Sequence, residues 1–108
     1  MTEAEGLARI EVCRKRIDEL DGDITALINE RARMASEIGQ VKKLFDMPVY
    51  APKREEMVYA NIFSHNRGPL RNDAMRRVYE RIIDEMRNLE KEQTVAERNA
   101  EHNESRGQ

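Results

Sequence analysis

Arg31 interrupts an otherwise apolar stripe along the first predicted helix. The stripe combines two columns of residues whose spacing alternates three and four, which is typical of a helix that packs along another helix. A guanidinium in such a seam keeps its proton, so it needs an anion beside it. The sequence leaves two sources open, a carboxylate of the protein or a bound anionic ligand. The stripe consists of Ile10, Cys13, Ile17, Leu20, Ile24, Leu27, Arg31, Met34, Ile38 and Val41.

Further charges fall on faces that the pattern predicts to be buried. Lys42 follows Arg31 by about three helical turns, so both side chains point the same way, about 16 Å apart, and could hold one small dianion. Glu90 continues the apolar face of the last predicted helix, and Arg54 and Glu55 open the middle one. Each of these charges also has a plainer interpretation. Arg31 could form a structural ion pair, and Lys42 could be a surface lysine. Arg54 and Glu55 could be solvated charges of a first turn, and Glu90 could lie at the edge of the apolar face.

Arg14 lies too far along the same helix to share that ligand, because it precedes Arg31 by about 25 Å. Two copies of the helix that cross antiparallel near residues 22–28 would bring position 14 of one chain to residues 30–42 of the other. A parallel pair would stack like charges on each other. The pattern therefore predicts an intertwined homodimer with two composite sites.

The remaining pattern predicts an all-α chain of three helices. The first covers residues 5–43, with Gly22 and Gly39 as weak points, since glycine costs about 1 kcal/mol against alanine in a helix. A loop over 44–51 leads into a helix over 52–64, which has Pro52 in its first turn and Ala51, a poor capping residue, at its N-cap. The third helix runs from Asn72 or Asp73 to about residue 96.

The third helix is predicted to bury one apolar face, and the polar segment behind it is predicted to be disordered. We therefore expect one helical domain over residues 1–98 and a disordered tail over 99–108. The buried face comprises Met75, Val78, Tyr79, Ile82, Ile83, Met86 and Leu89.

Composition narrows the function classes. The net charge of −2 gives no basic field of the kind that marks nucleic-acid binding. No apolar run reaches the roughly 18 residues that a membrane span needs, and the polar N-terminal residues do not resemble a signal peptide, so a cytoplasmic location is expected.

Cys13 excludes an internal disulfide and is expected to be a small apolar filler of the seam. The chain shows neither a metal-binding motif nor a nucleophile with a histidine partner, so no metal, cofactor or membrane partner is expected.

Taken in order, these residues resemble the all-helical class of chorismate mutase over about residues 8–91. Each motif alone is weak, and their order and spacing together make the resemblance specific. The motifs are Arg14 with Ile17, Asp18, Leu20 and Asp21; Leu27 and Ile28 with Glu30 and Arg31; Gly39 with Lys42; Pro52 with Arg54 and Glu55; the turn of Gly68, Pro69 and Leu70; and the run from Ile82 to Glu90.

The resemblance implies an intertwined dimer that rearranges chorismate to prephenate. It implies that Arg31 and Arg14 of the partner subunit hold the two carboxylates of the substrate. It further implies that Lys42 and Glu90 bond the ether oxygen of the breaking bond. A pericyclic reaction of this kind needs neither a nucleophile nor a general base.

The resemblance also implies roles at the mouth of the site, where the chain departs from some relatives. Arg54 would support a carboxylate, and Glu55 would accept from the ring hydroxyl. Ala51 stands where many relatives have a polar residue, and Met86 stands where some have serine. Glu90 is glutamine in some members, and a carboxylate would repel the ether oxygen, so here it must carry a proton to help.

Two other functions remain open at this stage. The first is isochorismate-pyruvate lyase, which has the same fold and nearly the same charges. The second is a noncatalytic helical pairing or regulatory domain of a shikimate-pathway enzyme. The sequence also leaves open whether the chain is a whole protein or a domain of a fusion, and whether it associates with another enzyme of that pathway.

Overall fold

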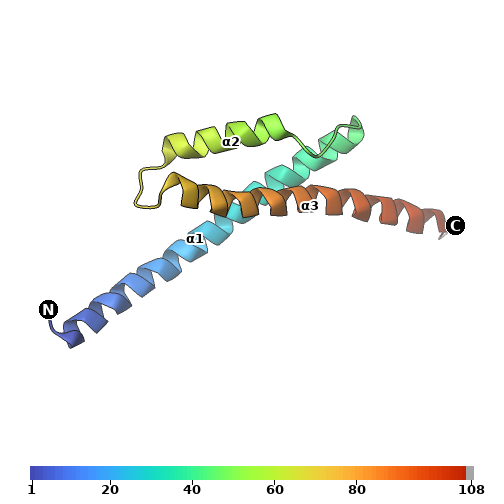
Figure 1. Cartoon of the computed structure of the whole chain (residues 1–108). Coiled ribbons are helices and arrows are strands. Elements are labelled where there is room, and N and C mark those ends of the chain that lie inside the picture. Colours follow the sequence, from blue (N-terminus) through green and yellow to red (C-terminus); the bar gives the residue numbers. More distant parts are fainter. Residues whose placement is uncertain (107–108) are drawn as a thin grey trace. The chain divides into compact units, whose positions relative to one another are not determined.

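Three α-helices make up the described chain: α1 (Glu3–Leu44), α2 (Pro52–His65) and α3 (Asn72–Arg106) (Figure 1). The computed structural model describes the backbone of residues 1–106 and the side chains of residues 1–92. No strand occurs within residues 1–106, so the all-α prediction is confirmed. Over the same residues, no helix combines the length and apolar character that a bilayer crossing requires. The chain divides into two units, Met1–Arg31 and Ala32–Gln108.

The first helix begins two residues earlier than the sequence pattern indicated, because Thr2 caps it. The Thr2 hydroxyl accepts a hydrogen bond from the backbone N–H of Glu5 at 3.2 Å, and its carbonyl accepts from Gly6 at 3.0 Å. A threonine followed three residues later by a glutamate is a typical helix-start pattern. The acidic side chains of Glu3 and Glu5 also suit the positive end of the helix dipole.

The apolar stripe of the first unit is open to solvent within the single chain. Ile10, Ile17 and Ile24 are 45%, 52% and 50% exposed, and Leu27 is 62% exposed. Cys13 is exposed as well, so the expectation that it fills a packed seam is wrong for the single chain. An exposed apolar stripe of this length is unusual for a monomer.

The end of α1 forms a Schellman motif that reverses the chain. The N–H of Met47 bonds the carbonyl of Lys42 at 2.7 Å, and the N–H of Asp46 bonds that of Lys43 at 3.3 Å. Asp46 takes the left-handed conformation that this motif needs, with φ of 54°. These bonds satisfy carbonyls at the helix end and direct the following loop back toward Lys42.

In the second unit, α2 and α3 pack side by side as a helical hairpin (Figure 1). Asn66 ties the connecting turn: its amide donates to the Leu70 carbonyl at 2.9 Å and to Asn72 Oδ1 at 2.8 Å. Its own Oδ1 accepts from the N–H of Gly68, whose φ of 71° suits glycine. One side-chain amide thus fixes both ends of the turn.

The predicted apolar face of α3 is confirmed in part. Ile83 and Met86 are buried, and Met75, Tyr79, Ile82 and Leu89 are half-buried. Val78 is 50% exposed, so its predicted burial is wrong within this chain.

The third helix continues to Arg106, about ten residues beyond its predicted end near residue 96. Polar residues can extend a helix without an apolar face, which periodicity alone does not detect. The side chains from residue 93 onward, and residues 107–108 altogether, lie outside the described part. The domain limits 1–98 and the disorder of 99–108 stay predictions.

Candidate active site

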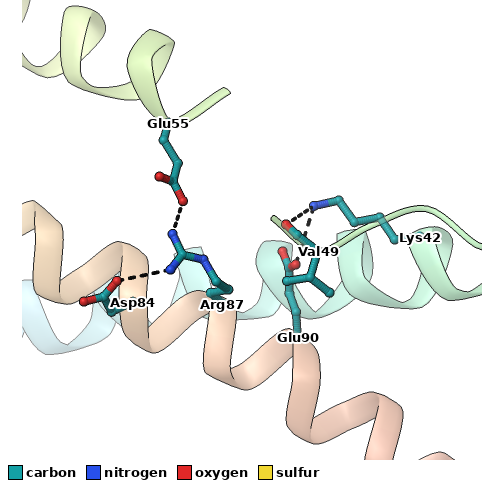
Figure 2. A network of polar contacts seen from close by, with 6 residues as sticks. All are labelled: Lys42, Val49, Glu55, Asp84, Arg87 and Glu90. Atoms are coloured by element: carbon teal, nitrogen blue, oxygen red, sulfur yellow. Dashed lines mark hydrogen bonds and ion pairs between the residues drawn. The ribbon is translucent and has the colours of Figure 1, made fainter. Parts of the chain in front are cut away.

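A buried pair of opposite charges joins the end of α1 to α3. Lys42 Nζ lies 3.5 Å from Glu90 Oε2, and their side chains are only 19% and 11% exposed (Figure 2). The ammonium also donates to the backbone carbonyl of Val49 at 3.1 Å. Two partners on different segments therefore hold one lysine in place, and a third N–H direction of the ammonium remains for a ligand.

Gly39 allows this pair to form, because it lets the two helices approach closely. A Cβ at this position would meet Glu90 Cγ at 3.2 Å and Glu90 Cα at 3.3 Å. Gly39 lies one turn before Lys42, on the same face of α1 as the buried Ala35. The residue predicted to be a weak point of the helix is thus the contact point that sets the distance between α1 and α3.

Apart from Glu90, the buried side chains described on α1 and α3 are apolar. Within the described side chains, those of Ala35, Ile83 and Met86 are 7%, 8% and 7% exposed, and Glu90 at 8% is the buried charged residue among them. Met86 and Glu90 are one helical turn apart on α3 and so share a face. Charges in a site with few waters interact more strongly than in bulk solvent, so the pair can act strongly on a bound polar group.

The loop and the first turn of α2 form the next part of the site. Ala51 is the N-cap and makes no side-chain capping bond, as predicted, and Pro52 occupies the first turn. Arg54 is exposed and Glu55 is half-buried. The helix therefore begins with backbone N–H groups that lack a side-chain acceptor, an arrangement that favours oxygen atoms of a ligand.

Arg87 of α3 is a site residue that the sequence reasoning missed. Its guanidinium donates to Glu55 Oε1 and lies 3.4 Å from Asp84 Oδ1 (Figure 2). It also lies over the ring of Tyr50, 5.5 Å from the centroid. The hydrogen bond to Glu55 raises the pKa of the Arg87 guanidinium, against a smaller opposing effect of burial. The sequence feature that could have identified Arg87 is its position directly after Met86, at the edge of the apolar face.

The two remaining predicted residues belong to the first unit. Arg14 is exposed and pairs with Glu11 of its own helix at 3.2 Å, a surface pair of little energetic weight. Arg31 is half-buried. The structure thus brings together Lys42 and Glu90, with the buried Met86 one turn from Glu90 on α3, and separately Glu55 and Arg87. The roles of all predicted residues stay predictions.

No three residues among the described His, Cys, Asp and Glu side chains are grouped so as to hold a metal ion.

Comparison with known proteins identifies the family. A model of chorismate mutase type II matches residues 13–91, which is most of the chain. The chain belongs to the chorismate mutase type II family. The resemblance inferred from the sequence motifs is confirmed by this match.

Individual chorismate mutases support the assignment in sequence and in structure. The chain is 34% identical to a chorismate mutase of Thermus thermophilus, with a TM-score of 0.75 over 77% of this chain and 94% of that one. It is 40% identical over 58 residues to a chorismate mutase of Methanocaldococcus jannaschii, which is 54% of this chain and 56% of that protein.

Larger relatives carry a second enzyme. The chain is 33% identical over 94 residues to a bifunctional chorismate mutase/prephenate dehydratase of Aquifex aeolicus. This match covers 83% of the chain but only 26% of that relative, so the chain spans about a quarter of the bifunctional protein.

Proposed function

We propose that this chain is a chorismate mutase, which rearranges chorismate to prephenate. The observation that carries the proposal is the buried pair of Lys42 and Glu90 beside Met86, in a chain of the chorismate mutase type II family. The reaction is an isomerisation: one ether C–O bond breaks, one C–C bond forms, and no atom enters or leaves. Binding and electrostatics can therefore supply all of the catalysis.

The ether oxygen is the atom on which catalysis would act. It gains negative charge as its bond breaks, and the Lys42 ammonium would stabilise that charge most strongly in the transition state. Val49 and Glu90 hold the ammonium before substrate arrives, so little reorganisation is needed. Glu90 would hold that ammonium in place and, when it carries a proton, would donate a hydrogen bond to the same oxygen.

The carboxylates of the substrate would be held by arginines. We assign one to Arg31 and the other to Arg14 of a second copy, with Arg54 supporting a carboxylate at the mouth. Holding both ends folds the enolpyruvyl arm over the ring, a conformer that brings the reacting carbons together. Glu55, beside Ala51, would accept from the ring hydroxyl.

A composite site of this kind requires an intertwined homodimer. Its support is the exposed apolar stripe of the first unit, which includes Ile10, Ile17, Ile24 and Leu27. These residues flank Arg14 along α1, so a helix of a second copy that packs on them would also lie next to the Arg14 side chain. Arg14 is exposed in the single chain and available to a neighbour.

Two wider assignments go with the proposal. We place the activity in the cytoplasm, because a lone cysteine suits a reducing compartment. We also propose association with another enzyme of aromatic biosynthesis. Its support is that the Aquifex aeolicus relative joins a chorismate mutase and a prephenate dehydratase in one chain.

The test is to follow loss of chorismate by absorbance, with isochorismate assayed in parallel. Lys42→Ala should lower turnover by about 10²–10³-fold or more with the dimer intact, because it removes the preorganised donor. Lys53→Ala, which changes an exposed lysine on α2, is the matched control and should stay active. Release of pyruvate from isochorismate with no loss of chorismate would instead identify a lyase. No turnover of either substrate would indicate a noncatalytic pairing domain.

A further inference from the structure

Arg87 connects three segments of the second unit. It projects from α3 and donates to Glu55 in the first turn of α2 (Figure 2). It also lies over the ring of Tyr50 at the end of the loop. Asp84, one turn earlier on α3, lies 3.4 Å from the guanidinium and restrains it from the other side. The side chains of Arg87 and Glu55 are only 26% and 28% exposed, so this pair is partly shielded from water.

The segment that Arg87 restrains is the one that contacts the catalytic lysine. Tyr50 directly follows Val49, whose carbonyl accepts from Lys42. Glu55 lies at the start of α2, where its N–H bonds the carbonyl of Ala51 at 3.1 Å. One guanidinium thus contacts the loop on one side of Ala51 and the helix on the other.

We propose that Arg87 is a positioning residue that orients the Glu55 carboxylate toward the ring hydroxyl of the substrate and restrains the Val49–Ala51 segment at Lys42. This role rests on the proposed function. Arg87 would not contact the reacting atoms and would act through Glu55 and the loop.

The chemistry of the pair supports this role. Arg87 occupies Oε1 of Glu55, so Oε2 remains to accept a hydrogen bond from a hydroxyl. A planar guanidinium fixes the plane of the carboxylate as well as its distance, which a lysine ammonium does not do. Without Arg87, the Glu55 side chain would be free to rotate at the helix start, and its orientation would have to be restored each time substrate binds.

The proposed role of Arg87 predicts a larger effect on KM than on kcat. Because the ring hydroxyl keeps its bonds during the rearrangement, Glu55 binds ground state and transition state alike, and its loss raises KM more than it lowers kcat. Arg87→Leu should therefore raise KM about ten-fold with a smaller change in kcat. Arg87→Lys, which keeps the charge but loses the planar fork, should give a smaller rise.

The deciding experiment combines Arg87→Leu with Glu55→Gln and measures KM and kcat for chorismate in all four proteins. The effect of Arg87→Leu on KM should largely vanish once Glu55 is changed, because the two act as one unit. Arg81→Leu is the control, since Arg81 is a 78% exposed arginine on the same helix that pairs with Glu85. Its KM should stay at the wild-type value.

The outcomes separate this role from the proposed function. A wild-type protein without mutase activity overturns both. An active wild type in which Arg87→Leu keeps its KM, or in which the two KM effects multiply independently, overturns the role of Arg87 alone. Should Arg87→Leu fail to fold, the same cycle with Arg87→Lys decides, and a KM rise that persists unchanged with Glu55→Gln contradicts the proposal.

Discussion

Glu90 of α3 lies 3.5 Å from the ammonium of Lys42 on α1, although 48 positions separate the two residues in the chain. This contact joins two residues that the sequence motifs had assigned to the same site. Both side chains are largely buried, so water screens their interaction less than it would at the surface. A substrate oxygen placed beside Lys42 would also be placed beside Glu90.

Glu90→Gln tests the contribution of the side chain at position 90. A carboxylate can only accept a hydrogen bond, whereas an amide of the same size can donate one to the ether oxygen. The variant should therefore keep mutase activity, while Glu90→Ala, which leaves Lys42 without its carboxylate partner, should lower kcat/KM. The measurement is kcat/KM for chorismate in the three proteins. An inactive Glu90→Gln, or an Ala variant as active as the wild type, would contradict this account of Glu90.

Gly39→Ala should weaken both stability and activity. The new Cβ would press on Glu90 at 3.2–3.3 Å, partly against backbone, so α3 must move outward. Overpacking of this kind costs about 1–3 kcal/mol, which equals or exceeds the gain of about 1 kcal/mol in helix propensity. Chemical denaturation and kcat/KM for chorismate measure the two effects.

Gly6→Ala is the matched control for this substitution. A Cβ at Gly6 meets only the sulfur of Met1, at an ordinary 3.7 Å, so this variant should be as stable as the wild type or slightly more stable. Equal behaviour of the two variants would show that Gly39 does not set the distance between the helices.

Asp46→Gly should stabilise the end of α1. Asp46 has φ of 54° in the Schellman motif, a conformation that glycine adopts without steric cost. The free energy of unfolding should rise by about 0.5–1 kcal/mol, while Asp46→Val should lower it, because a β-branched residue is strained there. Denaturant titration of the three proteins is the measurement, and a Val variant as stable as the Gly variant would contradict the assigned conformation.

The features of the fold that depend on residues close together in the sequence were predicted correctly. Three helices, the breaks at Pro52 and around Gly68, and the weak N-cap at Ala51 all follow from residue types and spacing, and all are confirmed. The start of α1 was missed because its cap, Thr2, precedes the apolar stripe. The extension of α3 to Arg106 was missed because polar helices carry no periodic signal.

The site was less accessible from the sequence, because it depends on how helices rotate against each other. Sequence reasoning named Glu55 but not Arg87, which is 32 positions away and meets it only once α2 and α3 have packed. It treated Gly39 as a defect, since a close approach between helices is not visible in one of them. The resemblance to chorismate mutases implied that Lys42 and Glu90 contact the same substrate oxygen, and the two side chains do meet.

The central claim is that each active site combines Lys42 of one chain with Arg14 of the other, and subunit complementation tests it directly. Arg14→Ala and Lys42→Ala should each be nearly inactive alone. Unfolded together and refolded as a mixture, they should recover about a quarter of wild-type activity, because half of the dimers are mixed and each of these has one intact site. A mixture of Lys42→Ala with Glu90→Ala, whose changes lie in the same half-site, should stay inactive. Recovery in the first mixture alone is the predicted result, and a first mixture that stays as inactive as its components would contradict the composite site.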